Sequence, residues 1–392
     1  MYPRFACDRV SLIIGGYPCM NVQEMTTVER QRSGTMACST IQCQLVILSC
    51  LIVICILFIV CIMLCPLCIK LPELVSADWH WNPPFDLKQT APANRLINLT
   101  NFSFVIDSDV CGGGNGSEGG GGDVFLLILV HSAPGNAAER TAIRQTWGYA
   151  TDNYGVRVRT AFLLADPRSE RMQRELVGEA ARHGDIVQGN FVDSYRNLTY
   201  KLMMGMKWAA ARCARAQFVL KSDDDVFVDT FAIVRMLRET YAGRGDLLLC
   251  NVWTGMPPVR DAASKWYLSP DEFADAEFKP YCSGWAIVLG RDVARAFSLA
   301  STNMTYLWID DVTTGILASE LSLRFTKLNE HFALNSHDIG KWAGERALTP
   351  PPFVITTYNR NTVFLQNIWR KCEEYYLNKT RPRINLFKWK LW

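Results

Sequence analysis

The sequence predicts an α/β fold, in which helices cover both faces of a mostly parallel sheet, preceded by one N-terminal transmembrane helix. Three observations predict it. A long apolar run lies near the N-terminus, a glycine-rich tract follows, and strand-like and helix-like segments then alternate. Their order predicts a cytoplasmic tail over 1–44, a membrane anchor over 45–65, a luminal stem over 66–122 and one luminal domain over 123–392.

The apolar run is long enough to cross a bilayer. It holds 21 residues, of which Ser49 is the only conventionally polar one, and no charged residue occurs from Ser33 to Ile69. As a helix it would be roughly 30 Å long, the thickness of a hydrocarbon core. A buried core helix is the alternative, but such helices usually keep a polar stripe. A cleaved signal peptide fits less well because a polar leader of about 44 residues precedes the run. We therefore expect a signal anchor.

Glycosylation sequons favour a luminal C-terminal domain, hence a single-pass type II orientation. Six follow the apolar run and none precedes it. The charges that flank the run favour a cytoplasmic N-terminus only slightly. The predicted N-glycosylation sites are Asn98, Asn101, Asn115, Asn197, Asn303 and Asn378.

The cysteines divide at the same border. Nine of the 14 lie in the tail, the apolar run and its edge, and five lie beyond: Cys111, Cys213, Cys250, Cys282 and Cys372. An oxidising lumen allows four of the five to pair. We expect Cys111, in the predicted stem, to stay unpaired, which permits a homodimer joined through its thiol.

Composition excludes two classes of protein. A hydrophobic fraction of 49% with 41 Lys+Arg against 38 Asp+Glu excludes a wholly disordered chain. A net charge of +3 gives no reason to expect a nucleic-acid binder. Within the predicted stem, the glycine tract at 112–122 cannot offset its ordering entropy, so we expect it to be flexible.

Beyond the stem, the pattern alternates between strands and helices. We predict strands at 123–133, 156–165, 186–187, 217–221 and 246–252. Helices are predicted between them, at 136–147, 168–183, 194–212 and 229–240. The first strand is a continuous apolar run, typical of a strand buried on both faces. In sheets of this kind, ligands bind beyond the carboxyl ends of the strands.

An acidic triplet, Asp223 to Asp225, stands directly after the fourth predicted strand. Three adjacent carboxylates repel one another, so their clustering favours a bound cation. Mg²⁺ and Mn²⁺ take carboxylate oxygens together with phosphate oxygens. In an extended segment Asp223 and Asp225 would point to the same side. The alternative is a solvated acidic turn before a helix capped by Asp229.

A second acidic pair, Asp310 and Asp311, opens a segment of helical periodicity. Helix capping explains such residues in general, and we expect it for Asp310 on the local sequence alone. A carboxylate beside apolar walls can instead act as a general base, because desolvation raises its proton affinity. For Asp311 the local sequence leaves both readings open.

Two further segments carry candidate ligand contacts. Arg140 and Arg144 share one helix face near the end of the first strand and could bind a phosphate or pair with acidic neighbours, salt bridging being the default. Aromatic residues surround Gly284, as for stacking on a sugar or for an aromatic core corner.

Taken in order, these segments resemble the β-1,3-galactosyltransferase family (glycosyltransferase family 31). The resemblance covers roughly residues 123–372. The matching blocks are ERTAIRQTWG (139–148), FVDSYRNLTYK (191–201), FVLKSDDDVFV (218–228), KWYLSP (265–270) with PYCSGWA (280–286), and IDDVTTG (309–315). The resemblance implies a GT-A fold, which is Rossmann-like, in a Golgi type II membrane enzyme that uses a UDP-sugar and Mn²⁺.

The resemblance also implies roles for individual residues. Asp225, with Asp223 assisting, would hold Mn²⁺. Asp311 would be the base that deprotonates an acceptor hydroxyl, which then attacks the anomeric carbon with inversion. The residues that would bind the nucleotide-sugar are Arg140, Arg144, Lys221, Asp223 and Asp224. Those on the acceptor side would be Trp266, Tyr281, Gly284, Trp285 and Asp310.

Three positions depart from the family pattern. Asp310 stands where the family usually has Glu, and Trp285-Ala286-Ile287 alters a glycine-rich segment. Tyr358 stands where a histidine usually helps to bind the metal, and His331 or His337 is a possible substitute.

The acceptor is expected to be a glycan on a glycolipid or glycoprotein. Galactose is the favoured donor sugar and N-acetylglucosamine the nearest alternative. A catalytically weak family member that binds carbohydrate or assists assembly is a different possibility. A metal-dependent phosphohydrolase is disfavoured, because no second cluster of His and Asp follows the triplet.

Overall fold

A computed structural model of the chain describes residues 94–112, 124–149, 155–300, 304–333 and 335–380. The predicted tail and anchor and most of the predicted stem lie outside these residues, as do Asn115 and Asn303. Within the described ranges, no helix has the length and apolar character needed to cross a membrane.

The main sheet of the described region is mostly parallel, as predicted. Its strand order is β1-β4-β3-β2-β5-β8-β7-β9. Four neighbouring strands, β4, β3, β2 and β5, run parallel, whereas β8 is antiparallel to both of its neighbours. The strands are β1 (Phe104–Ile106), β2 (Leu126–His131), β3 (Val158–Asp166), β4 (Ile186–Val192), β5 (Phe218–Asp223), β7 (Leu248–Trp253), β8 (Tyr281–Gly290) and β9 (Thr326–Lys327).

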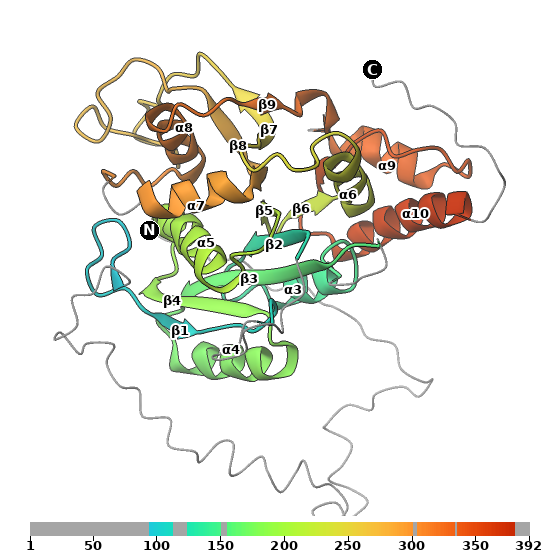
Figure 1. Cartoon of the computed structure of the whole chain (residues 1–392), viewed down its shortest axis with the longest axis horizontal. Coiled ribbons are helices and arrows are strands. Elements are labelled where there is room, and N and C mark those ends of the chain that lie inside the picture. The colour runs from blue at the N-terminus through green and yellow to red at the C-terminus, as the bar shows by residue number, and fades with distance from the viewer. Residues whose placement is uncertain (1–93, 113–123, 150–154, 301–303, 334, 381–392) are drawn as a thin grey trace, which may run out of the picture. The chain divides into compact units, whose positions relative to one another are not determined.

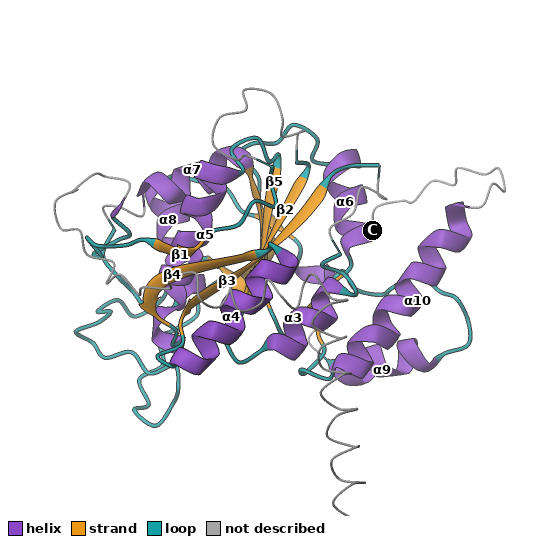
Figure 2. Ribbon diagram, turned by 90° about the horizontal axis from the view of Figure 1, so that it is seen from below, coloured by secondary structure: helices purple, strands orange, loops and turns teal. Residues whose placement is uncertain are grey.

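Helices cover both faces of this sheet (Figure 2). One face carries α5, α7 and α8, and the other carries α3 and α4. The helices are α3 (Ala137–Arg144), α4 (Glu170–His183), α5 (Leu198–Arg212), α6 (Thr230–Glu239), α7 (Arg291–Ala300), α8 (Asp310–Glu320), α9 (Ser336–Gly344) and α10 (Thr362–Thr380), with 3₁₀ turns at η3 (Tyr195–Asn197) and η4 (Asn329–His331).

Strand β2 shows why the first apolar run is continuous. Leu126, Ile128 and Val130 join the core under α3 and α4, and Leu127 and Leu129 join the core under α5 and α7. All five side chains are fully buried. Because successive strand residues point to opposite faces, a strand covered on both sides has apolar residues at both parities.

A second, three-stranded sheet of order β10-β11-β6 joins the C-terminal region to the end of β5. Its strands are β6 (Val226–Val228), β10 (Phe332–Ala333) and β11 (Ile355–Thr357). Val226 pairs with Thr357, which brings the residues after β11 next to the acidic triplet. Figure 1 shows β6 between β5 and the helices α6, α9 and α10.

Two expectations about the stem are wrong. Residues 94–112 belong to the compact domain, because β1 pairs with β4 and Phe102 is buried in the core. Cys111 is disulfide-bonded to Cys213 at the C-terminal end of α5, so its thiol cannot join two copies of the chain. Cys250 pairs with Cys282, and the unpaired cysteine among the five is Cys372, which is buried in α10.

Asn197, another predicted glycosylation site, is half-buried, and its glycosylation stays a prediction. The amide nitrogen of Asn197 donates a hydrogen bond to the carbonyl of Val192, and Thr199 of the same sequon is fully buried. Both groups are therefore built into the fold. Asn98 and Asn101 are exposed, and glycosylation there stays a prediction.

Candidate active site

The acidic triplet lies where β5 ends and the chain turns into β6. Asp223 is the last residue of β5, and Asp224 and Asp225 form the turn. The expectation that the triplet is extended is therefore wrong, because the chain leaves one sheet here and enters the other. Asp229 caps α6, as expected, by accepting a hydrogen bond from the amide of Ala232.

Lys221 gathers three carboxylates from two elements. Its ammonium lies 2.8 Å from Asp223 Oδ1 and 3.3 Å from Asp310 Oδ2, and it donates to the carbonyl of Gly284 at 2.5 Å. Its charge also acts on Asp311. We call Lys221, Asp223, Asp310 and Asp311 the inner cluster. The Lys221 side chain is only 1% exposed, so it holds these carboxylates together. The expectation that it contacts the nucleotide-sugar is wrong, because its ammonium is buried among these groups.

Asp311 lies in the first turn of α8, close to strand β8. A Cβ added to Gly284 would be 3.7 Å from its carboxylate. Burial, followed by the nearby charge of Asp310, raises the pKa of Asp311 to about 7. A carboxylate with this proton affinity accepts a hydroxyl proton more readily than an exposed aspartate does.

Gly315 explains how α8 comes this close to β8. A Cβ on Gly315 would lie 2.6 Å from both the carbonyl oxygen of Pro280 and the Cβ of Tyr281. Only glycine permits this approach. The N-cap of α8 is Ile309, so Asp310 is not the cap that we expected. Its carboxylate instead faces Lys221 and His131.

His131, the last residue of β2, is a part of the site that the sequence reading missed. Its Nδ1 lies 3.8 Å from Asp310 Oδ2 and 4.0 Å from Asp223 Oδ1. Burial, with the charges of Lys221 and Lys201, lowers the pKa of His131, so the buried imidazole is neutral. A single histidine after a strand carries no distinguishing sequence signal.

A second group of charges, the outer cluster, consists of Arg360, Glu139, Asp224 and Asp225. Arg360 Nη2 lies 3.3 Å from Asp224 Oδ1 and 3.5 Å from Asp225 Oδ2, and Nη1 lies 3.7 Å from Glu139 Oε1. The side chains of Arg360 and Asp225 are 46% and 41% exposed. Burial raises the pKa of Asp225, Arg360 opposes the rise, and Asp224 adds to it.

Asp224 is a positioning residue rather than the nucleotide contact we expected. Its side chain is 5% exposed. One oxygen accepts hydrogen bonds of 2.8 Å from both Ser132 and Asn136, and the other faces Arg360. Asp224 thereby ties the β5–β6 turn to the loop after β2.

The two arginines of α3 pair with carboxylates that lie outside the inner and outer clusters. Arg140 is fully buried and forms a two-bond ion pair with Glu179, at 2.7 and 2.8 Å. Arg144 pairs with Glu179 and Asp185. The expectation of direct nucleotide contacts is wrong, because these guanidinium groups fasten α3 to α4 and to the start of β4.

The Asp and Lys of the second matching block, Asp193 and Lys201, also form a structural pair. Lys201 donates to Asp193 at 2.8 Å and to the carbonyl of Ser132 at 2.7 Å. This buried pair holds α5 against the carboxyl end of β2.

Two exposed aromatic rings lie beside the inner cluster. The indole nitrogen of Trp266 donates to the hydroxyl of Tyr195 at 2.9 Å, and their side chains are about half exposed. The Lys265 ammonium lies 4.4 Å from the Trp266 ring centroid and 5.7 Å from that of Tyr195. The charges of Asp310, Asp311 and Asp223 act on the Tyr195 hydroxyl. The sequence reading gave Tyr195 no role.

The side chains of Tyr281 and Trp285 pack in different parts of the core. Tyr281 packs beside Phe278 and Trp308, and burial with the charge of Asp311 raises its pKa to about 12. The Trp285 side chain packs on the core under α3 and α4, whereas Gly284 faces Asp311 on α8. Trp285 is therefore wrongly placed on the acceptor side, because neighbouring strand residues alternate between faces.

Within the described ranges, no three His, Cys, Asp or Glu side chains are grouped so that protein ligands alone could hold a metal ion. Tyr358 is fully buried, and its hydroxyl donates to the backbone carbonyl of Asp224. His337 lines a cavity of about 490 Å³ together with Tyr358. The exposed carboxylate of Asp225 fits the kind of Mn²⁺ or Mg²⁺ site in which one or two carboxylates share the ion with phosphate oxygens.

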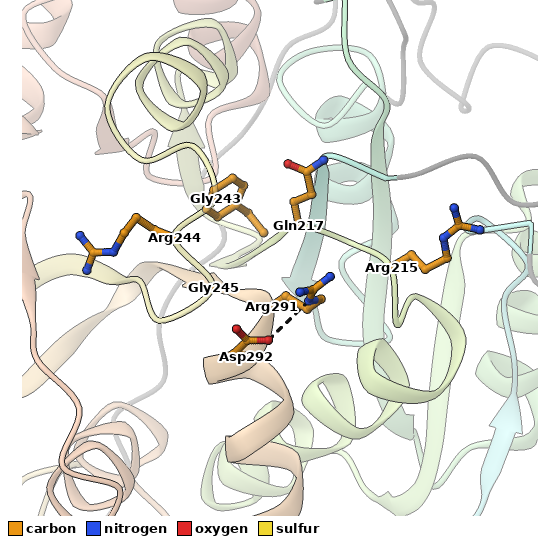
Figure 3. Close-up of a pocket in the computed structure, with 8 residues that line it drawn as sticks. Arg215, Gln217, Gly243, Arg244, Gly245, Arg291 and Asp292 are labelled. Carbon is orange, nitrogen blue, oxygen red and sulfur yellow. Dashed lines mark hydrogen bonds and ion pairs between the residues drawn. The ribbon is translucent and has the colours of Figure 1, made fainter.

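A cavity of about 440 Å³ opens at the other end of β5 (Figure 3). Arg215 and Arg244 point away from each other there, and Arg291 pairs with Asp292. Because Gln217 and Phe218 line it at the start of β5, a whole strand separates this cavity from the acidic triplet. It is not part of the candidate active site.

Comparison with known proteins gives the family of the chain. Residues 138–329 match the family described as galactosyltransferase. Beta-1,3-galactosyltransferase 5 of Pan paniscus is 37% identical over 209 residues, which are 52% of this chain and 68% of that protein. The chain belongs to the galactosyltransferase family. The matched range contains the whole inner cluster, whereas Arg360 of the outer cluster lies beyond it.

Other relatives of this galactosyltransferase family member carry different names. The human acetylgalactosaminyl-O-glycosyl-glycoprotein beta-1,3-N-acetylglucosaminyltransferase is 38% identical over 236 residues, 58% of this chain and 59% of that protein. The human lactosylceramide 1,3-N-acetyl-beta-D-glucosaminyltransferase is 36% identical over 250 residues, 62% of this chain and 63% of that protein. Relatives of similar identity thus bear the names of two different donor sugars.

Proposed function

We propose that this chain transfers a sugar from a UDP-sugar to a hydroxyl of an acceptor glycan, forming a β-1,3 linkage with inversion. The observation that carries the proposal is Asp311, a partly buried carboxylate of raised pKa beside two exposed aromatic rings. Galactose is the favoured donor sugar, and N-acetylglucosamine is the alternative, since relatives bear both names.

In the proposed reaction Asp311 accepts the proton of the acceptor hydroxyl. The hydroxyl oxygen forms a bond to the anomeric carbon of the donor as the bond from that carbon to the diphosphate oxygen breaks. UDP leaves with the bonding electrons, and the configuration inverts because attack comes from the opposite face. Asp310 and Lys221 keep Asp311 at this place, because their mutual ion pair fixes the start of α8 against β5.

Trp266 and Tyr195 would bind the acceptor sugar by stacking. Sugars present apolar C–H faces, and exposed aromatic rings next to a catalytic carboxylate offer a surface for them. The hydrogen bond between the two side chains fixes the angle between the rings.

Asp225, with Asp223 at the adjoining end of β5, would hold the divalent metal. When bound, Mn²⁺ would supply positive charge to the departing diphosphate. The carboxylate chemistry and the exposure of Asp225 support this assignment. Replacing Asp225 with alanine is expected to weaken Mn²⁺-dependent UDP binding, measured by calorimetry. Unchanged metal dependence would refute the assignment.

We also propose that the chain is a single-pass type II protein of the Golgi membrane, with its catalytic domain in the lumen. The apolar run at 45–65 and the exposed sequons at Asn98 and Asn101 support this orientation. Protease protection of intact vesicles tests it. Digestion of the C-terminal domain before the vesicles are opened would overturn it.

The activity is tested with the purified full chain in detergent and Mn²⁺. UDP-galactose, UDP-N-acetylglucosamine and UDP-N-acetylgalactosamine are each offered with acceptors ending in β-GlcNAc, β-Gal or α-GalNAc. UDP release that requires both donor and acceptor, with a β-1,3 linkage in the product by NMR, supports the proposal. Asp311→Asn is the inactive control. Turnover with N-acetylglucosamine alone would replace galactose as the donor, and UDP binding without transfer to any acceptor would favour a carbohydrate-binding role.

A further inference from the structure

Arg360 carries a positive charge into the part of the site where the metal is proposed to bind. Its guanidinium faces carboxylates from two regions, Glu139 on α3 and the pair Asp224 and Asp225 after β5. The contact with Asp225 is 3.5 Å, so the proposed metal ligand already has a cationic partner within the chain. Nearly half of the Arg360 side chain remains exposed.

The local backbone fixes this position. Asn361 N donates to the carbonyl of Tyr358 at 3.0 Å, which closes a tight turn between β11 and α10. Both central residues are left-handed, with φ of 50° at Asn359 and 57° at Arg360. This is the pattern of a type I′ turn, in which glycine is preferred at the second central position. An arginine there costs conformational free energy, which its three ion pairs can offset.

The guanidinium is also suited to a phosphate. It presents five N–H donors in a planar fork that matches phosphate oxygens, and a lysine ammonium does not. A donor diphosphate held beside Asp225 would come within reach of Arg360, because the two side chains are in contact.

We propose that Arg360 is the built-in cation of the nucleotide site. It neutralises Asp224 and Asp225 in the metal-free protein and contacts the diphosphate of the donor, so that part of donor binding needs no divalent metal. This inference rests on the proposed function, because it takes a nucleoside diphosphate as the ligand beside Asp225. It also implies that Arg360 and the metal compete for Asp225.

The test measures two affinities that should change in opposite directions. Mn²⁺ binding to the full chain without nucleotide is followed by the electron paramagnetic resonance signal of free Mn²⁺. UDP binding in excess EDTA is followed by calorimetry. Arg360→Gln is expected to bind Mn²⁺ about tenfold more tightly, because a cation 3.5 Å from Asp225 is removed, and to bind UDP in EDTA about tenfold more weakly.

Three other variants separate charge from structure. Arg360→Gly suits the left-handed backbone and should behave like Arg360→Gln while preserving the turn. Arg360→Lys keeps the charge and should lie close to the unsubstituted protein in Mn²⁺ affinity. Arg370→Gln removes an equal charge from α10, where Arg370 pairs with Glu374, and should change neither affinity.

A merely structural role for Arg360 predicts that both affinities fall together, and that result would overturn the inference. So would an unchanged Mn²⁺ affinity in both Arg360→Gln and Arg360→Gly. If UDP binds the unsubstituted chain only with Mn²⁺, the diphosphate contact is refuted and the proposed function stands. If UDP binds under neither condition, the proposed function fails together with the diphosphate contact.

Discussion

The inner and outer clusters have the same composition, three carboxylates around one cation, but they differ in burial. Lys221 is 1% exposed, whereas Arg360 is 46% exposed. A buried cation among carboxylates cannot be replaced by water or a ligand without a large cost in free energy, because the carboxylates would be left buried and unpaired. An exposed one is screened by solvent and can change partners. The difference indicates that the inner cluster fixes geometry and that the outer cluster is able to exchange its cation.

The largest expected effect falls on the inner cluster. Replacing Asp311 with asparagine removes the proposed base while keeping the shape of the side chain. We expect kcat to fall by about 10³-fold, since a positioned general base contributes roughly 10²–10⁴-fold. UDP affinity, measured by calorimetry, should change by less than about twofold. Unchanged turnover would remove Asp311 from the base role.

Replacing Lys221 with methionine tests whether the inner cluster is a fixed structural unit. Three carboxylates would lose their buried counter-charge, and we expect the free energy of unfolding to fall by about 3–5 kcal/mol at pH 8. The loss should be smaller at pH 5, where protonation of the carboxylates relieves their repulsion. Denaturant unfolding at both pH values measures this. A loss below about 1 kcal/mol at pH 8 would show that the cluster is not held together by Lys221.

The pH dependence of activity sharpens the role of Asp310. With the pKa of Asp311 near 7, the base loses its charge below that pH, and kcat/KM should fall about tenfold per pH unit. Replacing Asp310 with asparagine removes a charge that raises this pKa, so the acidic limb should move to lower pH. If the acidic limb of the kcat/KM profile stays at the same pH in this variant, the group that titrates is not Asp311.

The raised pKa of Asp311 affects folding stability in the opposite direction: activity should rise with pH, whereas the contribution of this group to stability should fall. The folded chain keeps the Asp311 proton up to about pH 7, whereas an ordinary aspartate releases it near 3.8. Between these values the folded state binds more protons than the unfolded state. This group therefore favours folding more at pH 5 than at pH 8.

The sequence predicts the sheet well where the signal is local. The buried strand before Asp223 and the helices of the first half follow from runs and periodicities of neighbouring residues. The membership of β1 in the sheet escaped prediction, because a three-residue strand between two sequons and a glycine tract has no period to detect. Its partner β4 lies about 80 residues away, and the Cys111–Cys213 disulfide spans 102 residues.

The inner cluster is half predictable for a related reason. Both acidic motifs are visible in the sequence, and the family resemblance names them. Their meeting at Lys221 depends on β8 pairing with β5, and on Gly315 allowing α8 to approach β8. Neither contact leaves a local pattern.

The outer cluster was not predictable from the sequence. Arg360 reaches the triplet because β11 pairs with β6, which joins residues about 130 positions apart, and because the turn after β11 is left-handed at a non-glycine residue. In the sequence, the visible signal of this region is that Tyr358 stands in place of a histidine. In the structure, the Tyr358 hydroxyl donates to the backbone carbonyl of Asp224. The positive charge that faces Asp224 belongs to Arg360, two residues further along the chain.

The smallest expected effect is the stability cost of removing Arg360, and it is the direct counterpart of Lys221→Met. Ion pairs of half-exposed side chains contribute about 0–1 kcal/mol, so Arg360→Gln should lower the unfolding free energy by less than about 1 kcal/mol. Arg360→Gly should lower it less or raise it, because glycine accepts the left-handed turn without strain. Denaturant unfolding of both variants in EDTA, beside Arg370→Gln, measures the difference. A loss as large as that of Lys221→Met would mean that Arg360 is as firmly fixed as the inner cluster, and the contrast between an exchangeable and a fixed cation would not hold.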